Sequence, residues 1–191
     1  MDDPLARWHA EHLNFSALLD LLELQLAAFH AGDRPDYDVM VDIIQYLRSY
    51  SDLVHHPRED VAFTRMAERD AALSPVLSRL MQEHRVIAWA GEALLRRLEE
   101  SASDAMVSRS EVEAAAATYL VYYRHHLNTE ECEVLPKARG LLGEDDWKAV
   151  VAAGPAIDDP LIAEVAEARY RGLADWVSKR RGGHYGARHP T

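Results

Sequence analysis

Apolar residues recur every three or four positions along most of this chain, and stretches that alternate strictly between apolar and polar residues are nearly absent. The first pattern is typical of helices that bury one face, whereas alternation would have indicated half-buried strands. The apolar stripe is continuous over four long segments: residues 5–30, 37–69, 74–100 and about 111–139. The sequence therefore predicts an all-α protein with four long amphipathic helices.

The segments between these stripes hold residues that end or begin helices. Gly32 is expected to cap the first helix, because glycine readily adopts the left-handed conformation that follows many helices. Ser110 and Glu113 match the capping-box pattern at the start of the fourth helix, and Pro136 and Gly140 are expected to end it. Because the connections are short, we expect an antiparallel up-down four-helix bundle.

The chain beyond the fourth stripe has a different character. The bundle is expected to occupy residues 1–140. Residues 141–178 contain shorter amphipathic stretches, at 144–153 and from 158 to about 176, which we predict to be helices packed on the outside or the end of the bundle. Residues 179–191 are basic and rich in glycine, and are predicted to form a flexible tail.

Composition narrows the classes of protein that fit this pattern. The 191 residues carry a formal charge of −11, which argues against an electrostatic nucleic-acid binder. No apolar run approaches the roughly 20 residues that cross a membrane, and the N-terminus lacks the pattern of a signal peptide. The one cysteine, Cys132, excludes an internal disulfide framework and favours a cytoplasmic location. A protein partner or a homo-oligomer stays open.

Histidine is the residue type that points to chemistry, since the chain contains ten of them. Each predicted helix supplies at least one, and two helices add carboxylates close behind: His12; His55, His56 and Glu59; His84; and His125, His126, Glu130 and Glu131. Positions four residues apart share a helix face. The pairs His55/Glu59 and His126/Glu130 can therefore face one centre, while His56 and His125 are the alternatives, at less favourable spacings.

The same unit occurs twice along the chain. His12 precedes His55 as His84 precedes His126, at nearly equal separations, so that two helix pairs would be related by an approximate twofold axis. Four imidazoles and two carboxylates would then meet in the core, where unpaired ionisable groups are costly. Imidazole with carboxylate is a ligand set for iron, manganese or zinc, and two carboxylates shared between two ions are how helical bundles hold dinuclear sites.

These residues and their surroundings resemble the hemerythrin-like family, the HHE cation-binding domain, over about residues 5–139. The resemblance lies in EHLNFSALLDLL (11–22), YSDLVHHPRED (50–60), MQEHRVIAWAGEAL (81–94) and YYRHHLNTEECEVLP (122–136). It implies a four-helix bundle with a non-haem di-iron centre, two iron ions bridged by carboxylate and by oxo or hydroxo. Manganese or zinc is the weaker alternative. The ligands that it implies are His12, His55, Glu59, His84, His126 and Glu130, with both glutamates bridging.

The sequence also departs from the oxygen-carrying members of that family. They have a fifth histidine where this chain has Ala88, and an aspartate where it has Glu131. The remaining set of four histidines and two glutamates resembles the branch linked to nitric-oxide response, iron-cluster repair and iron sensing. The resemblance implies a protein that binds or reacts with O₂, NO or peroxide, with enzymatic turnover left open. The alternative is a non-enzymatic module for iron storage, delivery or metal-dependent regulation.

Several neighbours of the predicted ligands invite a specific interpretation. Pro57 lies between a histidine and a glutamate ligand and predicts a kink or π-bulge or, alternatively, a break between two helices that meet at the site; either would aim Glu59 inward. Gly91, like Ala88, either leaves room for a diatomic ligand or only permits close helix packing. Tyr122 shares a face with His126 and is interpreted as a core tyrosine or, alternatively, as a hydrogen-bond donor to a bound ligand.

The remaining candidates are weaker. Glu92 is a possible accessory carboxylate two turns beyond His84. Cys132 is interpreted as a buried inert thiol. The other four histidines lack acidic partners at ligand spacing and are expected on the surface: His9, His30, His184 and His189.

Overall fold

The computed structural model describes residues 3–102, 108–161 and 168–185, and every regular element in those ranges is helical, as the periodicity predicts. The elements that form the bulk of the molecule are α1 (Pro4–Ala31), α2 (Tyr37–Tyr46), the π-helix η1 (Leu47–His55), α3 (His56–Arg69), η2 (Ala71–Leu73), α4 (Ser74–Ala102), α5 (Arg109–Thr129), the π-helix η3 (Glu130–Val134) and α6 (Leu135–Leu141). They are followed by α7 (Glu144–Ala152), η4 (Ala168–Tyr170) and α8 (Arg171–Tyr185).

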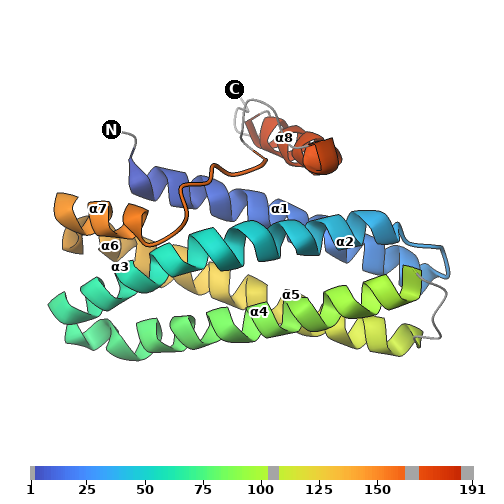
Figure 1. Cartoon of the computed structure of the whole chain (residues 1–191), viewed down its shortest axis with the longest axis horizontal. Helices are drawn as coiled ribbons and strands as arrows, with labels where there is room; N and C mark the ends of the chain where they lie inside the picture. Colours follow the sequence, from blue (N-terminus) through green and yellow to red (C-terminus); the bar gives the residue numbers. More distant parts are fainter. Residues whose placement is uncertain (1–2, 103–107, 162–167, 186–191) are drawn as a thin grey trace, which may run out of the picture.

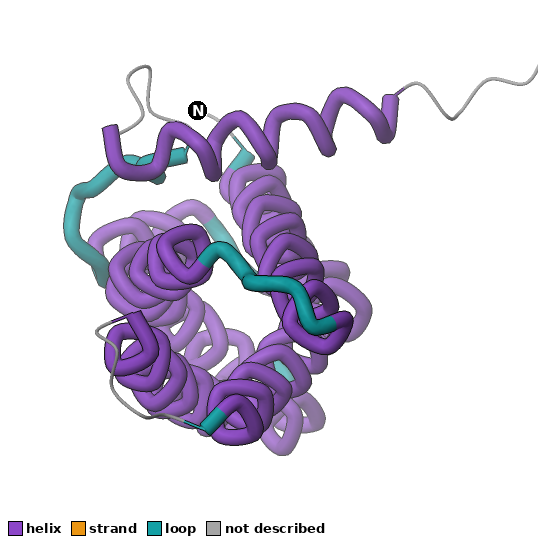
Figure 2. The backbone as a smooth tube through the Cα atoms, turned by 90° about the vertical axis from the view of Figure 1, so that its right-hand side faces the viewer, coloured by secondary structure: helices purple, strands orange, loops and turns teal. Residues whose placement is uncertain are grey.

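The long helices form a bundle. Figure 1 shows α1, the run from α2 to α3, α4, and the run from α5 to α6 side by side, and Figure 2 shows them around a common interior. Helix α1 packs against α2 and α5, and α4 packs against α2, α3 and α5. The prediction of a helical bundle is therefore confirmed.

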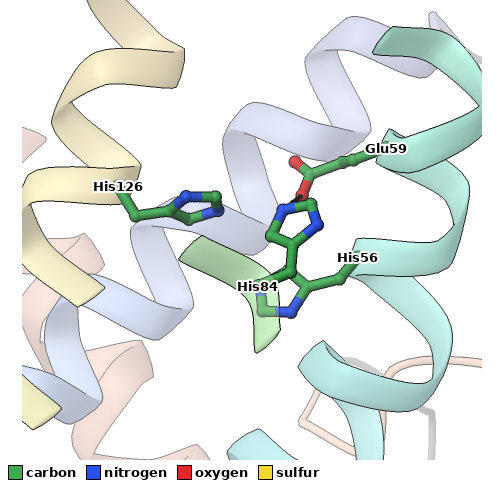
Figure 3. Close-up of side chains that lie close together, drawn as sticks. All are labelled: His56, Glu59, His84 and His126. Atoms are coloured by element: carbon green, nitrogen blue, oxygen red, sulfur yellow. Dashed lines mark ion pairs between the residues drawn. The ribbon is translucent and has the colours of Figure 1, made fainter. Parts of the chain in front are cut away.

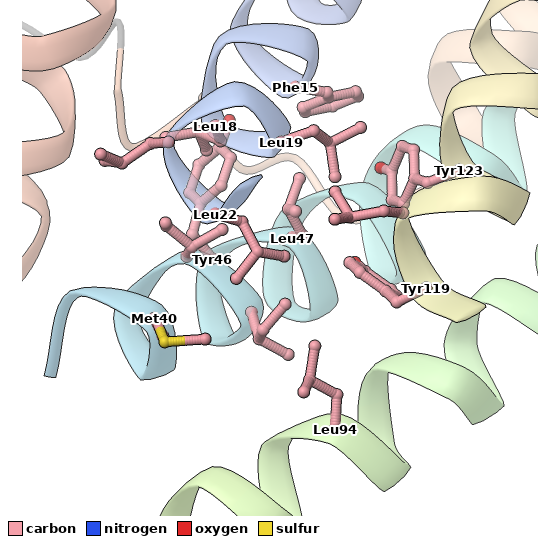
Figure 4. Packing of buried hydrophobic residues seen from close by; sticks show 14 of the residues in the cluster. Phe15, Leu18, Leu19, Leu22, Met40, Tyr46, Leu47, Leu94, Tyr119 and Tyr123 are labelled. Atoms are coloured by element: carbon pink, nitrogen blue, oxygen red, sulfur yellow. The ribbon is translucent and has the colours of Figure 1, made fainter. Parts of the chain in front are cut away.

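A polar layer divides the core of the bundle into two apolar clusters. The larger cluster, part of which is drawn in Figure 4, contains Phe15 of α1 and Ile87 of α4, whereas the smaller one contains Trp8 of α1 and Leu80 of α4. On each of these helices a histidine lies between the residues of the two clusters. His12 lies between Trp8 and Phe15 on α1, and His84 lies between Leu80 and Ile87 on α4. The apolar stripes thus hold the polar layer in the middle of the bundle.

The structure confirms one predicted helix end and corrects another. Gly32 caps α1 in the left-handed conformation, with φ of 88°. The capping box of α5 is formed by Ser108 and Glu111, not by Ser110 and Glu113. The Ser-x-x-Glu pattern occurs at both positions, so the sequence alone could not choose between them.

The fourth helical run also differs at its far end. Pro136 does not end it, because Pro136 is the second residue of α6, where the missing N–H of proline is tolerated. A π-helical turn, η3, comes just before it. The run continues past Gly140 and ends at Leu141.

The C-terminal part agrees with the prediction only in its first helix. Helix α7 is close to the expected 144–153, but residues 158–161 are not helical, and 162–167 lie outside the described residues. The helix resumes at Ala168 and reaches Tyr185, beyond the expected end near residue 176. Helix α8 lies across α1 (Figure 2), and the indole of Trp176 donates a hydrogen bond to the carbonyl of Ala17 at 3.1 Å.

The predicted tail is therefore helical at its start, and its residues 186–191 lie outside the described part. Among the described residues, no helix is long and apolar enough to cross a membrane.

Candidate metal centre

The polar layer brings together all six ligands that the sequence predicts. Each of these side chains is buried, with at most 6% of its surface exposed: His12, His55, Glu59, His84, His126 and Glu130. They come from α1, η1, α3, α4, α5 and η3, which is why residues up to 118 positions apart share one site.

Two imidazoles and one oxygen of each central glutamate form a first subsite. Nε2 of His12 lies 3.0 Å from Nε2 of His55. The Oε1 atom of Glu59 lies 2.9 Å from His55 and 3.3 Å from His12. The Oε2 atom of Glu130 lies 3.5 Å from Nε2 of His12.

The other oxygens of the same two glutamates face a second subsite, which contains His84 and His126. Nε2 of His84 lies 3.3 Å from Oε2 of Glu59 and 3.8 Å from Oε1 of Glu130. Nε2 of His126 lies 3.0 Å from that same Glu130 oxygen. Figure 3 shows His84, His126 and Glu59 converging from three helices. Each glutamate thus offers one oxygen to each subsite, as a bridging carboxylate does.

These separations suit metal ions. A metal–ligand bond of about 2.0–2.2 Å places neighbouring ligand atoms roughly 3 Å apart. Five buried atoms in the layer also have no hydrogen-bond partner within the described structure: Oε2 of Glu59, both carboxylate oxygens of Glu130, and Nε2 of His84 and of His126. Leaving such buried atoms without a hydrogen bond is expensive, and bound cations would satisfy all of them.

A second ring of carboxylates holds the four imidazoles. Each histidine presents Nε2 to the centre, and its Nδ1 lies next to a different acidic side chain. The pairs are His12 with Glu131 at 2.7 Å, His55 with Glu11 at 2.6 Å, His84 with Asp60 at 2.8 Å and His126 with Glu83 at 3.3 Å. An Nδ1–H donated to a carboxylate keeps the Nε2 lone pair free for a metal ion and fixes the ring orientation.

Sequence reasoning singled out only Glu131 from this outer ring. The sequence does contain a signal for the other three, because acidic residues adjoin the predicted ligands at equivalent positions in the two halves of the chain. Glu11 and Glu83 directly precede the histidines of α1 and α4, and Asp60 and Glu131 directly follow the two central glutamates. Each acidic residue supports the histidine of a neighbouring helix, so the outer ring ties the helices of the bundle together.

Two π-helical segments carry ligands into the layer. Segment η1 ends at His55, and η3 begins at Glu130. The π-helical distortion predicted near Pro57 is confirmed, since the π-helix η1 ends just before this proline. The second π-helix, η3, was not predicted. Each π-helical turn holds an extra residue, so the helix face on one side of it is offset from that on the other.

The carboxylates favour the charged form of the ligand imidazoles when no metal ion is bound. Burial alone would lower the pKa of His12, but Glu131 and Glu59 raise it to about 10. Burial also opposes charge on His55, and Glu59 with Glu11 raises its pKa to about 9. Burial of Glu59 works against its ionisation, yet the imidazoles, led by His55, hold its pKa well below the usual value.

The two alternatives within the histidine pairs have different outcomes. His56 is buried, and its ring stacks on that of His84 at 4.2 Å between centroids. It lies near enough to Glu59, His84 and His126 to be a further donor, although its Nε2 is also 3.1 Å from the hydroxyl of Ser51. His125 is 55% exposed and lies outside the layer.

Two other candidates are wrong. Tyr122 lies on the surface, and Tyr123 is the buried tyrosine. The buried stripe of α5 runs through Tyr119, Tyr123 and His126 in steps of four and three, which leaves Tyr122 one position off the stripe. Glu92 is 71% exposed and pairs with an arginine, so it does not reach the layer.

The remaining neighbours are structural or lie at the surface. A methyl group on Gly91 would come within 3.0 Å of the Tyr119 ring, so this glycine permits close packing. Cys132 is exposed and not buried as expected. His9 lies at the surface but contacts Glu131 at 2.9 Å, so it does have an acidic partner. His30 lies 3.5 Å from Glu113. The side chain of His184 and the whole of His189 lie outside the described part of the structure.

A helical bundle that buries a layer of imidazoles and carboxylates defines a class of proteins that bind metal cations through nitrogen and oxygen. Within that class, the chain belongs to the hemerythrin family: the model of the hemerythrin HHE cation-binding domain matches residues 3–138. No curated protein and no solved structure gives a significant match. Membership of this family confirms the resemblance seen in the sequence.

Proposed function

We propose that this protein holds a pair of iron ions in the polar layer and uses them to bind or react with O₂, NO or peroxide. The observation that carries the proposal is the arrangement of the two central glutamates, Glu59 and Glu130. Each presents one oxygen to each pair of imidazoles. One pair of ions bridged by two carboxylates accounts for that arrangement and for the unpartnered atoms.

The residues of the chain have distinct tasks in this proposal. His12 and His55 would hold one ion, and His84 and His126 the other, with His56 as a further donor to the second. The outer carboxylates fix the imidazole orientations, and the apolar clusters limit the access of water. Bound iron would supply reversible electron transfer to a small oxidant.

The wider organisation of the chain supports this assignment. We propose that residues 1–140 form an antiparallel up-down bundle that is sufficient to hold the metals, and that 141–178 is an extension packed on it. The lone cysteine and the nitrogen–oxygen ligand set suit a reducing cytoplasm. Residues 179–191 begin within α8 and would form the tail beyond it.

The test is a reaction with each candidate ligand. Protein loaded with iron(II) without oxygen is mixed with O₂, NO or peroxide, and the visible spectrum is followed; zinc-loaded protein is the matched control. We expect a spectral change with at least one ligand only in the iron form. Repeated turnover under reductant would identify an enzyme, and a single binding event would favour a sensor. Identical inertness of both forms would contradict the proposal.

A further inference from the structure

Four buried tyrosines lie in the larger apolar cluster beside the metal centre. The side chains of Tyr46, Tyr50, Tyr119 and Tyr123 are at most 1% exposed, and three of them are labelled in Figure 4. A buried hydroxyl costs free energy unless it is hydrogen-bonded, and phenylalanine would fill nearly the same volume without that cost. The hydroxyls therefore suggest a role beyond packing.

Two short routes connect Tyr46 to a predicted ligand. Along one, the ring of Phe15 lies 5.0 Å from that of His55 and 6.3 Å from that of Tyr46. Along the other, Tyr46 stacks on Tyr50 at 6.0 Å, and Tyr50 donates a hydrogen bond of 2.8 Å to Glu11, which also accepts from His55. Both routes proceed through rings in contact or through hydrogen bonds.

Tyr46 is also well placed to lose a proton. A tyrosine that gives up an electron must release its phenolic proton to a nearby base, since its cation radical is strongly acidic. The hydroxyl of Tyr46 donates to the carboxylate of Asp159 at 2.8 Å. Asp159 is buried, and burial raises the pKa of its carboxyl, which makes it a better proton acceptor than an ordinary aspartate.

The other buried tyrosines lack such an acceptor. Tyr50 donates to Glu11, but Arg7 and His55 donate to the same carboxylate, so both of its oxygens are already engaged by other donors. Tyr123 bonds to the hydroxyl of Ser51, whose oxygen also lies 3.1 Å from Nε2 of His56, so its proton would reach a base only through that intervening hydroxyl. The hydroxyl of Tyr119 has no partner within the described structure.

The C-terminal extension supplies the proton acceptor of Tyr46 and also a further aromatic ring in contact with it. Asp159 belongs to the segment between α7 and η4, and it is held by Asn14 as well as by Tyr46. Tyr170 of η4 places its ring 5.7 Å from that of Tyr46. Tyr46 thus lies between the metal centre and the extension.

We propose that Tyr46, with Asp159 as its proton acceptor, donates one electron to the metal centre when that centre meets hydrogen peroxide. The inference rests on the proposed iron site. In the balanced step, one of the two irons is already iron(III); peroxide takes one electron from the remaining iron(II) ion and one from Tyr46, its O–O bond breaks, and two protons from solvent complete two water molecules. The phenolic proton passes to Asp159 and leaves a neutral tyrosyl radical.

The experiment uses the full chain loaded with iron and poised with one iron(II) and one iron(III) ion per chain, mixed with one equivalent of hydrogen peroxide and frozen for electron paramagnetic resonance. We expect a tyrosyl radical that is lost in Tyr46→Phe and weakened in Asp159→Asn. Two matched controls should retain it. Tyr119→Phe removes a buried tyrosine without an acceptor, and Asn14→Ala removes the other side-chain bond to Asp159 while leaving that of Tyr46.

The same samples separate this inference from the function on which it rests. Iron content and the oxidation of iron(II) are measured alongside the radical. A full-strength radical in Tyr46→Phe, its loss in Asn14→Ala, or oxidation of iron without any radical would overturn the role of Tyr46 and leave the iron site standing. Failure of the wild-type protein to bind iron would overturn both.

Discussion

At the scale of single residues, the outer carboxylates decide what the imidazoles can do. Glu11 is the most enclosed of them, since it is buried and accepts from His55, Tyr50 and Arg7. These three donors, two from η1 and one from α1, leave the carboxylate little freedom to move. We therefore regard Glu11 as the positioning residue of His55, whose Nε2 faces the first subsite.

Replacing Glu11 should weaken metal binding without unfolding the protein. In Glu11→Gln the carboxylate that accepts the His55 Nδ1 proton is lost, and supports of this kind contribute about 10–100-fold to metal affinity. The affinity is measured by competition with a chelator. The matched control is Glu23→Gln, which removes an exposed glutamate that pairs with Arg124. Equal affinities of the two variants would contradict the role of Glu11.

The charge state of the imidazoles predicts a dependence on pH. The pKa of His12 is raised to about 10 and that of His55 to about 9, above the ordinary value of about 6.5. The charged pairs therefore stabilise the metal-free fold fully below pH 6.5, and that stabilisation is lost as the pH rises through 9–10. We expect the unfolding temperature of metal-free protein to fall from about pH 7 to about pH 10.

Metal binding should have the opposite dependence, because a metal ion requires imidazoles without a proton on Nε2. Affinity is expected to rise, with protons released, over the same pH range. Calorimetry in buffers of different ionisation enthalpy counts those protons, and circular dichroism follows unfolding. A metal-free protein whose unfolding temperature is flat between pH 7 and pH 10 would refute the charged pairs.

At the scale of elements, the π-helix η1 sets the register of two functions on one helical run. Residues before it, such as Ile43 and Ile44, pack in the larger apolar cluster, while His55 at its end and Glu59 after it face the metal centre. One residue corresponds to a rotation of about 100° around a helix. Without the extra residue, both sets could not face inward together.

Deleting Leu53 tests this register. Its side chain is exposed, so the deletion removes one residue from η1 with little loss of core contact. We expect the shortened run to keep its helicity and lose metal binding, as measured by circular dichroism and metal analysis. Leu53→Ala keeps the length of the run and should bind metal normally. Normal binding after the deletion would show that η1 is not needed.

Much of this element structure could be predicted from the sequence. The apolar stripes located the long helices. The spacing from His12 to His55, which recurs from His84 to His126, identified the histidines of the polar layer. The capping box failed because two Ser-x-x-Glu patterns overlap, and residue 122 was chosen on a face where a shift of one position decides burial. The outer carboxylates depend on contacts between helices, which spacing along one helix does not reveal.

At the scale of the whole molecule, the metal centre and the fold should stabilise each other. Buried charges of both signs meet in one layer, and metal ions bind the folded chain alone. A metal present at about 100 times its dissociation constant adds about 2.7 kcal/mol, or roughly 5–10 °C in a protein of this size. Thermal unfolding with and without iron measures this shift. A double variant, His12→Ala with His126→Ala, should lack it.

The C-terminal extension gives the molecule a feature that the matched family region, residues 3–138, does not include. Asp159 reaches back into the bundle, where it accepts hydrogen bonds from Asn14 and Tyr46. The sequence predicted a helix there, but a buried carboxylate in a non-helical segment has no periodic signal. The extension is therefore linked to the metal centre through Tyr46 and its neighbours.

The most direct measurement is the number of iron ions per chain. Protein reconstituted with iron and freed of excess metal is analysed for metal and protein content, alongside a variant in which both central glutamates are replaced, Glu59→Gln with Glu130→Gln. The account predicts two iron ions per chain in the wild-type protein and a large loss in the variant, with helicity kept in both. Wild-type protein that retains no iron, or a variant that retains as much as the wild type, would contradict it.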